Sequence, residues 1–111
     1  PEVGWDTQQR FNKLFPKKKY LNKKIPISEL STDYEVYKIR ARSTFELFDS
    51  IIGNNIYRVY PHKLFCNDVV KQRCITHDDN NIFYSSSNLL SIKGAELVNN
   101  LVIKELQNIQ R

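Results

Sequence analysis

Two stretches of apolar residues at helical spacing constrain the fold of this chain most. After the segment STDYE, apolar side chains recur every three or four positions at Tyr34, Tyr37, Ala41, Phe45, Phe48 and Ile52. This stripe predicts an amphipathic helix of about twenty residues that is closed by Gly53. A second stripe consists of Ala95, Val98, Leu101 or Val102, Leu106 and Ile109. It predicts a last helix, capped by Ser91, with these residues on its buried side.

The helix starts carry recognisable capping residues. Thr32 and Glu35 have the spacing of a capping box, which predicts that the long helix begins directly after them. Asp6 or Thr7 can cap a shorter first helix that runs to about Phe15.

PEVGW, at the start of the chain, resembles the exit of a strand into a turn, and two further stretches are typical of strands. The segment NIYRVYP, residues 55–61, alternates and is rich in β-forming residues, so it predicts a strand that Pro61 ends. The segment NIFY, residues 81–84, predicts a brief extended stretch. A strand between two long amphipathic helices is an incomplete layer, because each apolar helix face must be buried against another element. A parallel sheet with further strands would complete it.

The positive charge is local. The chain carries a net charge of +5, and residues 1–24 alone account for all of it. Residues 16–28, with two prolines and five lysines, predict a basic surface loop. Its lysines could bind an anionic glycan or membrane surface, or could simply be solvated; they are Lys17, Lys18, Lys19, Lys23 and Lys24.

The two cysteines, Cys66 and Cys74, lie eight residues apart. This spacing permits a disulfide without obvious strain, and it equally permits two unpaired buried thiols. A disulfide would indicate an oxidising compartment. We expect no metal site, because there is no second cysteine pair and because His62 and His77 form no recognisable ligand pattern with this one.

Length and composition favour one small globular domain. With 111 residues, 41% of them hydrophobic, we expect residues 1–111 to form a single domain. The apolar runs are too short for a membrane helix. The chain begins at Pro1 without a signal-peptide pattern, so we expect it to be a piece of a longer protein. We expect no nucleic-acid partner, because the aromatic residues have helical core spacing and do not alternate with arginines.

Five segments in order resemble a known family. They are PEVGW, the helix from Tyr37 to Phe48, YRVYPHKLFC with its second cysteine, IFY, and SNLLSIKGAELV. Together they resemble the last third of an SGNH-type hydrolase domain. They are most similar to the periplasmic SGNH domain fused to membrane proteins of the acyltransferase-3 family, which O-acetylate cell-surface polysaccharides such as lipopolysaccharide O-antigen.

The resemblance places the family's catalytic turn on residues 86–95. In the family an Asp-x-x-His-Leu-Ser-x-x-Gly-Ala segment closes the active site, and this chain has its second half, Leu90–Ser91 and Gly94–Ala95. The catalytic Asp and His positions fall on Ser86 and Leu89. Leu89 cannot accept a proton and Ser86 carries no charge, so this turn lacks both working groups of a Ser-His-Asp system.

Other residues do not restore the missing chemistry. Asn88 has no titratable nitrogen. His77 and Asp78 are adjacent and lie upstream of the extended segment, so their side chains are expected to diverge. The family's Gly-Asp-Ser nucleophile block and its oxyanion blocks do not occur in the 111 residues. We therefore expect no catalytic residue in this chain.

The resemblance implies a fold, a function and partners. The implied fold is α/β, the C-terminal portion of a flavodoxin-like three-layer domain with two long helices and one or two parallel strands. It also implies a disulfide between Cys66 and Cys74 and a location on the periplasmic side of the bacterial inner membrane. The implied partners are an upstream membrane acyltransferase domain and a cell-surface glycan. No cofactor is expected, since the acetyl donor belongs to the full-length family.

The alternative function is that of a non-catalytic module. In that interpretation the basic loop binds an anionic glycan or the membrane surface, and salt would weaken the binding.

Overall fold

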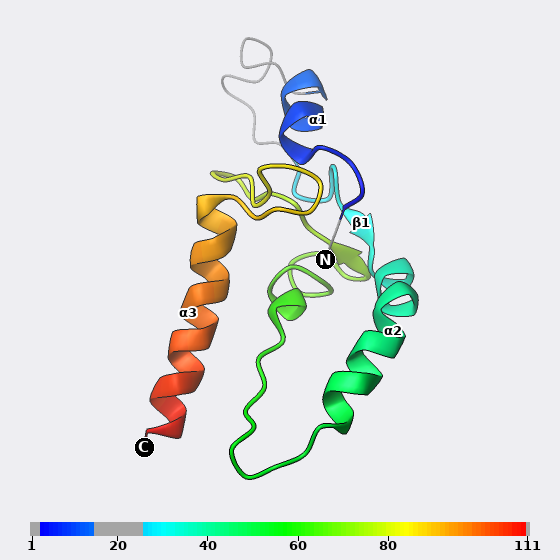
Figure 1. Ribbon diagram of the computed structural model, residues 1–111. Helices are drawn as coiled ribbons and strands as arrows, with labels where there is room; N and C mark the ends of the chain where they lie inside the picture. Colours follow the sequence, from blue (N-terminus) through cyan, green and yellow to red (C-terminus); the bar gives the residue numbers. More distant parts are fainter. Residues whose placement is uncertain (1–2, 15–25, 111) are drawn as a thin grey trace.

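The computed structural model describes residues 3–14 and 26–110, and its elements are mainly helical (Figure 1). In chain order they are α1 (Thr7–Leu14), β1 (Thr32–Asp33), α2 (Tyr34–Ser50), the 3-10 helix η1 (Pro61–Leu64), β2 (Arg73–Cys74) and α3 (Ile92–Ile109). The predicted first, long and last helices are all present. Phe15, Pro16 and the five lysines of the predicted basic loop lie outside the described residues.

Side-chain caps begin the helices. The Asp6 carboxylate accepts a hydrogen bond from the Gln9 amide at 3.0 Å, which satisfies one of the unpaired donors of α1. At α2 the predicted cap is wrong by one residue, because the Asp33 carboxylate accepts from the Glu35 amide at 2.8 Å. Thr32 is instead held in β1, opposite Cys74.

The predicted strand at residues 55–61 is wrong. Residues 56–60 have no ladder partner among the described residues, and Pro61 starts η1 instead of ending a strand. The guanidinium of Arg58 donates to the carbonyl oxygens of Phe48, Asp49 and Ile51. These carbonyls lie at the end of α2, where no further helical amide is available to donate to them. Arg58 therefore links the connecting segment to the helix terminus.

The sheet is small and antiparallel. Strands β1 and β2 pair with Thr32 opposite Cys74 and Asp33 opposite Arg73. The predicted parallel strands do not occur among residues 3–14 and 26–110. The extended segment at residues 81–84 is held by isolated bridges, His77 to Ile82 and Tyr84 to Leu90. The described chain is therefore of mixed α/β content with one short antiparallel ladder.

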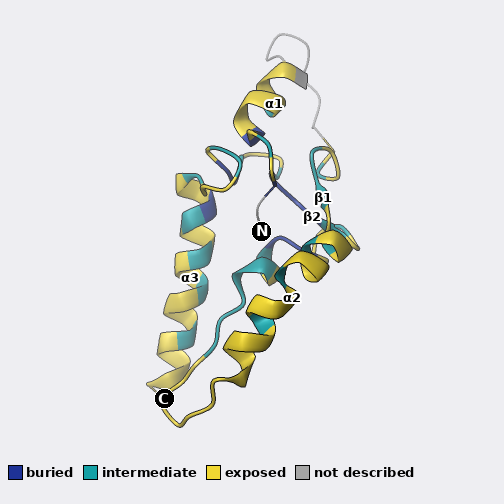
Figure 2. Cartoon of the chain, turned by 45° about the vertical axis from the view of Figure 1, so that its right-hand side comes forward, coloured by how far each residue is buried: buried dark blue, intermediate teal, exposed yellow. Residues whose placement is uncertain are grey.

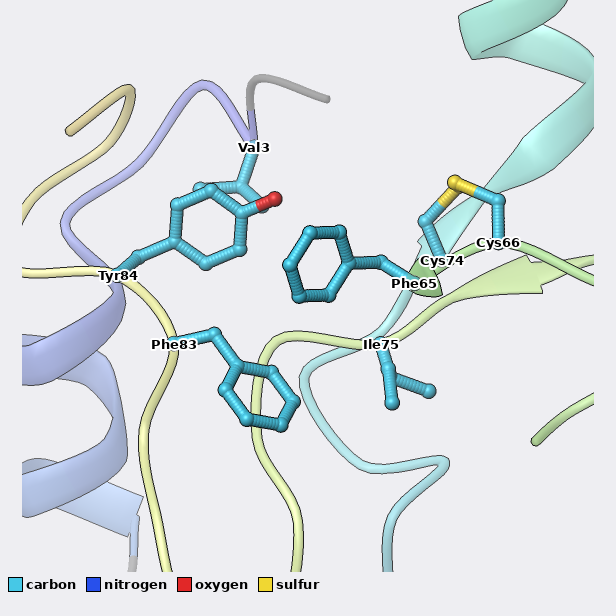
Figure 3. Packing of buried hydrophobic residues seen from close by; sticks show 7 residues of the cluster. All are labelled: Val3, Phe65, Cys66, Cys74, Ile75, Phe83 and Tyr84. Carbon is cyan, nitrogen blue, oxygen red and sulfur yellow. A yellow bond between two sulfur atoms is a disulfide. The ribbon is translucent and has the colours of Figure 1, made fainter. Parts of the chain in front are cut away.

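A compact core lies where the chain segments meet, at one end of both long helices (Figures 2 and 3). Its buried hydrophobic residues are Val3, Phe65, Cys66, Cys74, Ile75, Phe83 and Tyr84. The Phe65 ring lies 5.4 Å from that of Phe83 and 6.3 Å from that of Tyr84, centroid to centroid. The core thus joins the N-terminal segment, the cysteine loop and the segment before α3.

The long helices extend from this core in the same general direction (Figure 1). The radius of gyration is 16.0 Å, whereas a compact chain of this length has about 13 Å. No residue of α2 is buried, and in α3 only Gly94 is. The distal halves of both helices are largely exposed (Figure 2). The expectation of two buried stripes is therefore wrong there, since Phe48 is 58% exposed and Leu106 is 51% exposed. The described residues supply no layer that covers them.

None of the helices in the described part of the chain combines the length and the apolar character needed to cross a membrane.

Candidate functional site: the turn before the last helix

Backbone hydrogen bonds close the turn at residues 84–90. Tyr84 and Leu90 form an antiparallel bridge, and the Ser85 amide donates to the Leu89 carbonyl at 2.9 Å. The N-terminal segment joins the turn, because the Val3 amide donates to the Ser87 carbonyl at 3.0 Å. Phe83 and Tyr84 are buried in the core and anchor its first residues. The turn is therefore a supported structure that can hold side chains in fixed places.

Ser91 joins the turn to α3. Its hydroxyl accepts from the Gly94 amide at 3.1 Å and donates to the Ile82 carbonyl at 2.6 Å. Its amide donates to the Phe83 carbonyl at 2.8 Å. The predicted role of Ser91 as the cap of the last helix is confirmed.

Gly94 permits the close approach of α3 to the segment before the turn. A Cβ atom at this position would lie 2.3 Å from the Phe83 carbonyl oxygen, far inside contact distance. The spacing of Ser91 and Gly94 thus has a physical cause, since one residue supplies the cap and the other leaves room for the carbonyl.

Ser86 and Leu89 occupy this turn without lining the groove next to it. Ser86 is half-buried, whereas the Leu89 side chain is 63% exposed. The groove, of about 510 Å³, lies between α2, the turn and α3, and Asn88 and Leu90 are the turn residues that line it. The neutral hydroxyl and the aliphatic chain leave the turn without a proton acceptor.

The groove beside the turn, here called the turn groove, has a polar and aromatic lining. Tyr37, Arg40 and Thr44 line it from α2, and Tyr84 lines it from the core. Burial, with a smaller contribution from Tyr37, raises the pKa of Tyr84. Burial and the neighbouring Tyr34 likewise raise the pKa of Tyr37. Both phenols therefore stay protonated and can donate hydrogen bonds, but neither is a base.

His77 and Asp78 have structural roles. His77 is fully buried, and its ring nitrogens lie 2.9 Å from the Glu29 carbonyl and 3.1 Å from the Asp78 carbonyl. The Asp78 carboxylate accepts from the amides of Asn80 and Asn81, at 2.8 and 2.7 Å. Both side chains thus bind backbone groups, and neither lines the turn groove.

Cys66 and Cys74 form a disulfide. Both residues are buried in the core, and Cys74 belongs to β2. Within the loop that the bond closes, the Asn67 amide donates to the Arg73 carbonyl at 2.9 Å. The bond therefore fixes this loop against the core on one side and against β1 on the other.

Sequence reasoning missed a second cluster, centred on His62. The rings of Tyr34, Tyr37, Phe45 and Tyr60 all lie within 6.5 Å of the His62 ring, centroid to centroid. Burial, and secondly the charge of Lys63, lowers the pKa of His62. The helical spacing of Tyr34, Tyr37 and Phe45 predicted a buried stripe. No periodic pattern could indicate that Tyr60 and His62, from beyond the helix, pack against that stripe.

Among the described residues no group of three or more His, Cys, Asp or Glu side chains is placed to hold a metal ion.

The comparison with family models covers the core segments, the disulfide loop and the capped turn. A family model described as the SGNH domain fused to AT3 domains matches residues 1–104. The chain belongs to this SGNH domain family. It is therefore an acyltransferase-associated domain of a family that is joined to AT3 domains. Comparisons with curated proteins and with solved structures gave no match.

Proposed function

We propose that this chain is the C-terminal part of a periplasmic SGNH domain in a membrane protein that acetylates a cell-surface polysaccharide. We further propose that the chain has no acyl-transfer activity of its own. The family match over residues 1–104 supports the first statement. The residue types at positions 86 and 89 support the second.

Acyl transfer of this type needs several groups at once. An imidazole removes the proton of a serine hydroxyl, and a carboxylate orients the imidazole. An oxyanion hole stabilises the tetrahedral intermediate. Ser86 and Leu89 stand where the family has the carboxylate and the imidazole, and the Gly-Asp-Ser block that carries the nucleophile does not occur in these 111 residues. The turn keeps its cap and its glycine without these groups.

The exposed apolar residues of α2 and α3 support a place within a larger domain. Ile39 and Leu47 of α2 are 60% and 63% exposed, and Ile103 and Leu106 of α3 are 50% and 51% exposed. Exposed apolar surface of this kind on a helix is typical of a face that another layer covers. We propose that the remaining strands of the SGNH domain cover it in the longer protein.

The disulfide supports the periplasmic location. Disulfides persist in oxidising compartments such as the bacterial periplasm and are rare in the cytosol. The Cys66–Cys74 bond is buried, so it is a structural bond rather than an exposed regulatory pair. The domain would then face the side of the membrane on which the polysaccharide is modified.

The decisive experiment restores the two missing groups. Ser86→Asp and Leu89→His are introduced together in the protein that joins this chain to its membrane domain, and hydrolysis of p-nitrophenyl acetate is measured. A positioned general base contributes about 100-fold or more to the rate, so we expect a gain of that order over the parent.

A shifted pair serves as the matched control. Ser85→Asp with Asn88→His introduces the same two groups one residue earlier in the turn, at two exposed positions. No gain in the restored protein, or an equal gain in the shifted control, would contradict the assignment of the turn.

The second candidate function is a basic binding module, and the local charge of residues 1–24 favours it. Replacement of the five lysines at positions 17–19 and 23–24 by glutamine tests it through binding to vesicles that contain anionic lipid. Salt-dependent binding of the parent that the variant loses would support this function. Parent binding that does not weaken in high salt would rule it out.

A further inference from the structure

A groove separate from the turn combines aromatic rings with charges of both signs. We call it the His62 groove; it has a volume of about 410 Å³, and its rings are those of Tyr34, Phe45, Tyr60 and His62. Its α2 residues lie on a different side of the helix from those that line the turn groove. No residue of the turn at 84–90 lines it.

The rings form a supported platform. Tyr34 packs against the buried core, and its ring lies 6.5 Å from that of His62. Phe45 contacts His62 more closely, at 4.7 Å between centroids. The Tyr60 hydroxyl donates to the Asp49 carboxylate at 3.1 Å, which fixes the ring in place. Aromatic side chains that are already held lose little entropy when a ligand packs on them.

Cations surround this platform. The Lys63 ammonium lies 4.6 Å from the centre of the Tyr60 ring, and the Lys38 ammonium lies 4.8 Å from the centre of the Tyr34 ring. Arg42 has no ion-pair partner among the residues that the structure describes, so its guanidinium can bind a carboxylate or phosphate with two parallel hydrogen bonds.

Carboxylates line the groove as well. Lys38 is paired with Glu35 at 2.9 Å, and Asp49 is bound by Tyr60 and lies 3.6 Å from the Arg58 side chain. Glu46 also lines the groove and has no ion-pair partner within the described ranges. A carboxylate oxygen accepts hydrogen bonds from hydroxyl groups, which sugars carry in number and the sugar-phosphate backbone of DNA lacks.

We propose that the His62 groove binds a sugar unit that carries a negative charge, within the glycan on which the longer protein acts. The rings pack against the apolar face of the sugar, Arg42 and Lys63 bind its anionic substituent, and Glu46 accepts from its hydroxyl groups. Pockets for small ligands have this composition, with a mostly apolar lining and a few placed polar groups. The proposal deepens the proposed function, because it names an acidic glycan as the substrate class.

The test follows the two imidazole rings by NMR. The chain has only two histidines, so the His62 signal reports the groove and the fully buried His77 signal reports the fold. The probes are trigalacturonate and sialyllactose, with the neutral methyl ester of trigalacturonate for comparison. We expect at least one acidic sugar to shift the His62 signal in a saturable way while the His77 signal stays in place. For trigalacturonate, we expect the ester to bind about tenfold more weakly or worse.

Variants locate the contact. Arg42→Gln and Lys63→Gln should each weaken binding about tenfold, since each removes one charge-assisted interaction. Lys104→Gln makes the same change of charge on an exposed part of α3 and should bind as the parent does. The comparison between acid and ester uses the unmodified chain, so it holds even if a variant fails to fold.

Three outcomes would overturn the proposal. The first is that neither acidic sugar shifts the His62 signal, and the second is that acid and ester bind equally. The third is that phosphatidylglycerol vesicles or a single-stranded thymidine oligonucleotide shift this signal while neither sugar does. Binding needs no acyl transfer, so a failure here leaves the restored-turn experiment unaffected, and a failure of that experiment leaves the binding result intact.

Discussion

Gly94→Ala should destabilise the chain through a contact that a single methyl group makes. The new Cβ would lie 2.3 Å from the Phe83 carbonyl oxygen, and the oxygen belongs to backbone that cannot rotate away. Overpacking of this kind costs ~1–3 kcal/mol. The displacement of α3 would also weaken the two bonds that Ser91 donates, to Phe83 and Ile82. Each such bond is worth ~0.5–1.5 kcal/mol.

One effect acts in the other direction. Alanine favours a helix over glycine by ~1 kcal/mol. Subtracting it from the contact cost and the cost of both hydrogen bonds leaves a net loss of ~1–5 kcal/mol in the free energy of unfolding.

Urea denaturation followed by circular dichroism measures this loss, with the disulfide left intact. We expect a lower midpoint with an unchanged slope. Gly53→Ala is the matched control, because its Cβ would meet only the flexible Ile56 side chain, at 3.3 Å. A neutral surface substitution usually changes the free energy of unfolding by no more than ~0.5 kcal/mol. If the free energies of unfolding of Gly94→Ala and Gly53→Ala differ by no more than this, the reasoning about the Phe83 carbonyl is wrong.

Three further predictions concern the disulfide, Arg58 and Tyr84. Cys66→Ser with Cys74→Ser should lower the free energy of unfolding by ~2–3 kcal/mol, as measured by urea denaturation, because the bond closes a short loop; an unchanged midpoint would contradict this. Arg58→Ala should cost ~1–2 kcal/mol and speed amide exchange at the end of α2, since three carbonyls lose their donor; exchange as slow as in the parent would refute the capping role. In an absorbance titration Tyr84 should ionise above the ordinary tyrosine pKa of 10.0. Because its folded pKa lies above that value, its contribution to stability is complete below pH 10.0 and is lost as the pH rises through the folded pKa; a Tyr84→Phe variant with the same titration curve above pH 10.0 as the parent would speak against its burial.

The elements found correctly from the sequence are those whose cause is local. Ser91 caps α3 because its hydroxyl reaches the Gly94 amide three residues later, a geometry that spacing alone predicts. The same is true of Asp6 at α1. The resemblance that located the turn also rested on short-range order, and the family match over residues 1–104 confirms the family.

The errors concern pairing between distant segments. Residues 55–61 have the alternation of a strand, but a strand needs a neighbour, and Arg58 instead binds the carbonyls at the end of α2. The sequence predicted Thr32 as the cap of α2, but the cap is Asp33, because Thr32 pairs with Cys74, far along the chain. Neither partner could be inferred from spacing.

The sequence by itself determined the helices, the caps of α1 and α3, and the residue types at positions 86 and 89, because side-chain composition and short-range spacing set these properties. Only the tertiary structure decided which apolar residues are covered and which rings gather around His62. It brings Tyr60 and His62 back to the side of α2 that carries Tyr34 and Phe45, although a connection and a 3-10 helix separate them in the chain. The physical reason is that burial and clustering depend on contacts between segments far apart in the chain. A periodic pattern predicts which side of a helix is apolar, but not which distant segment packs against that side.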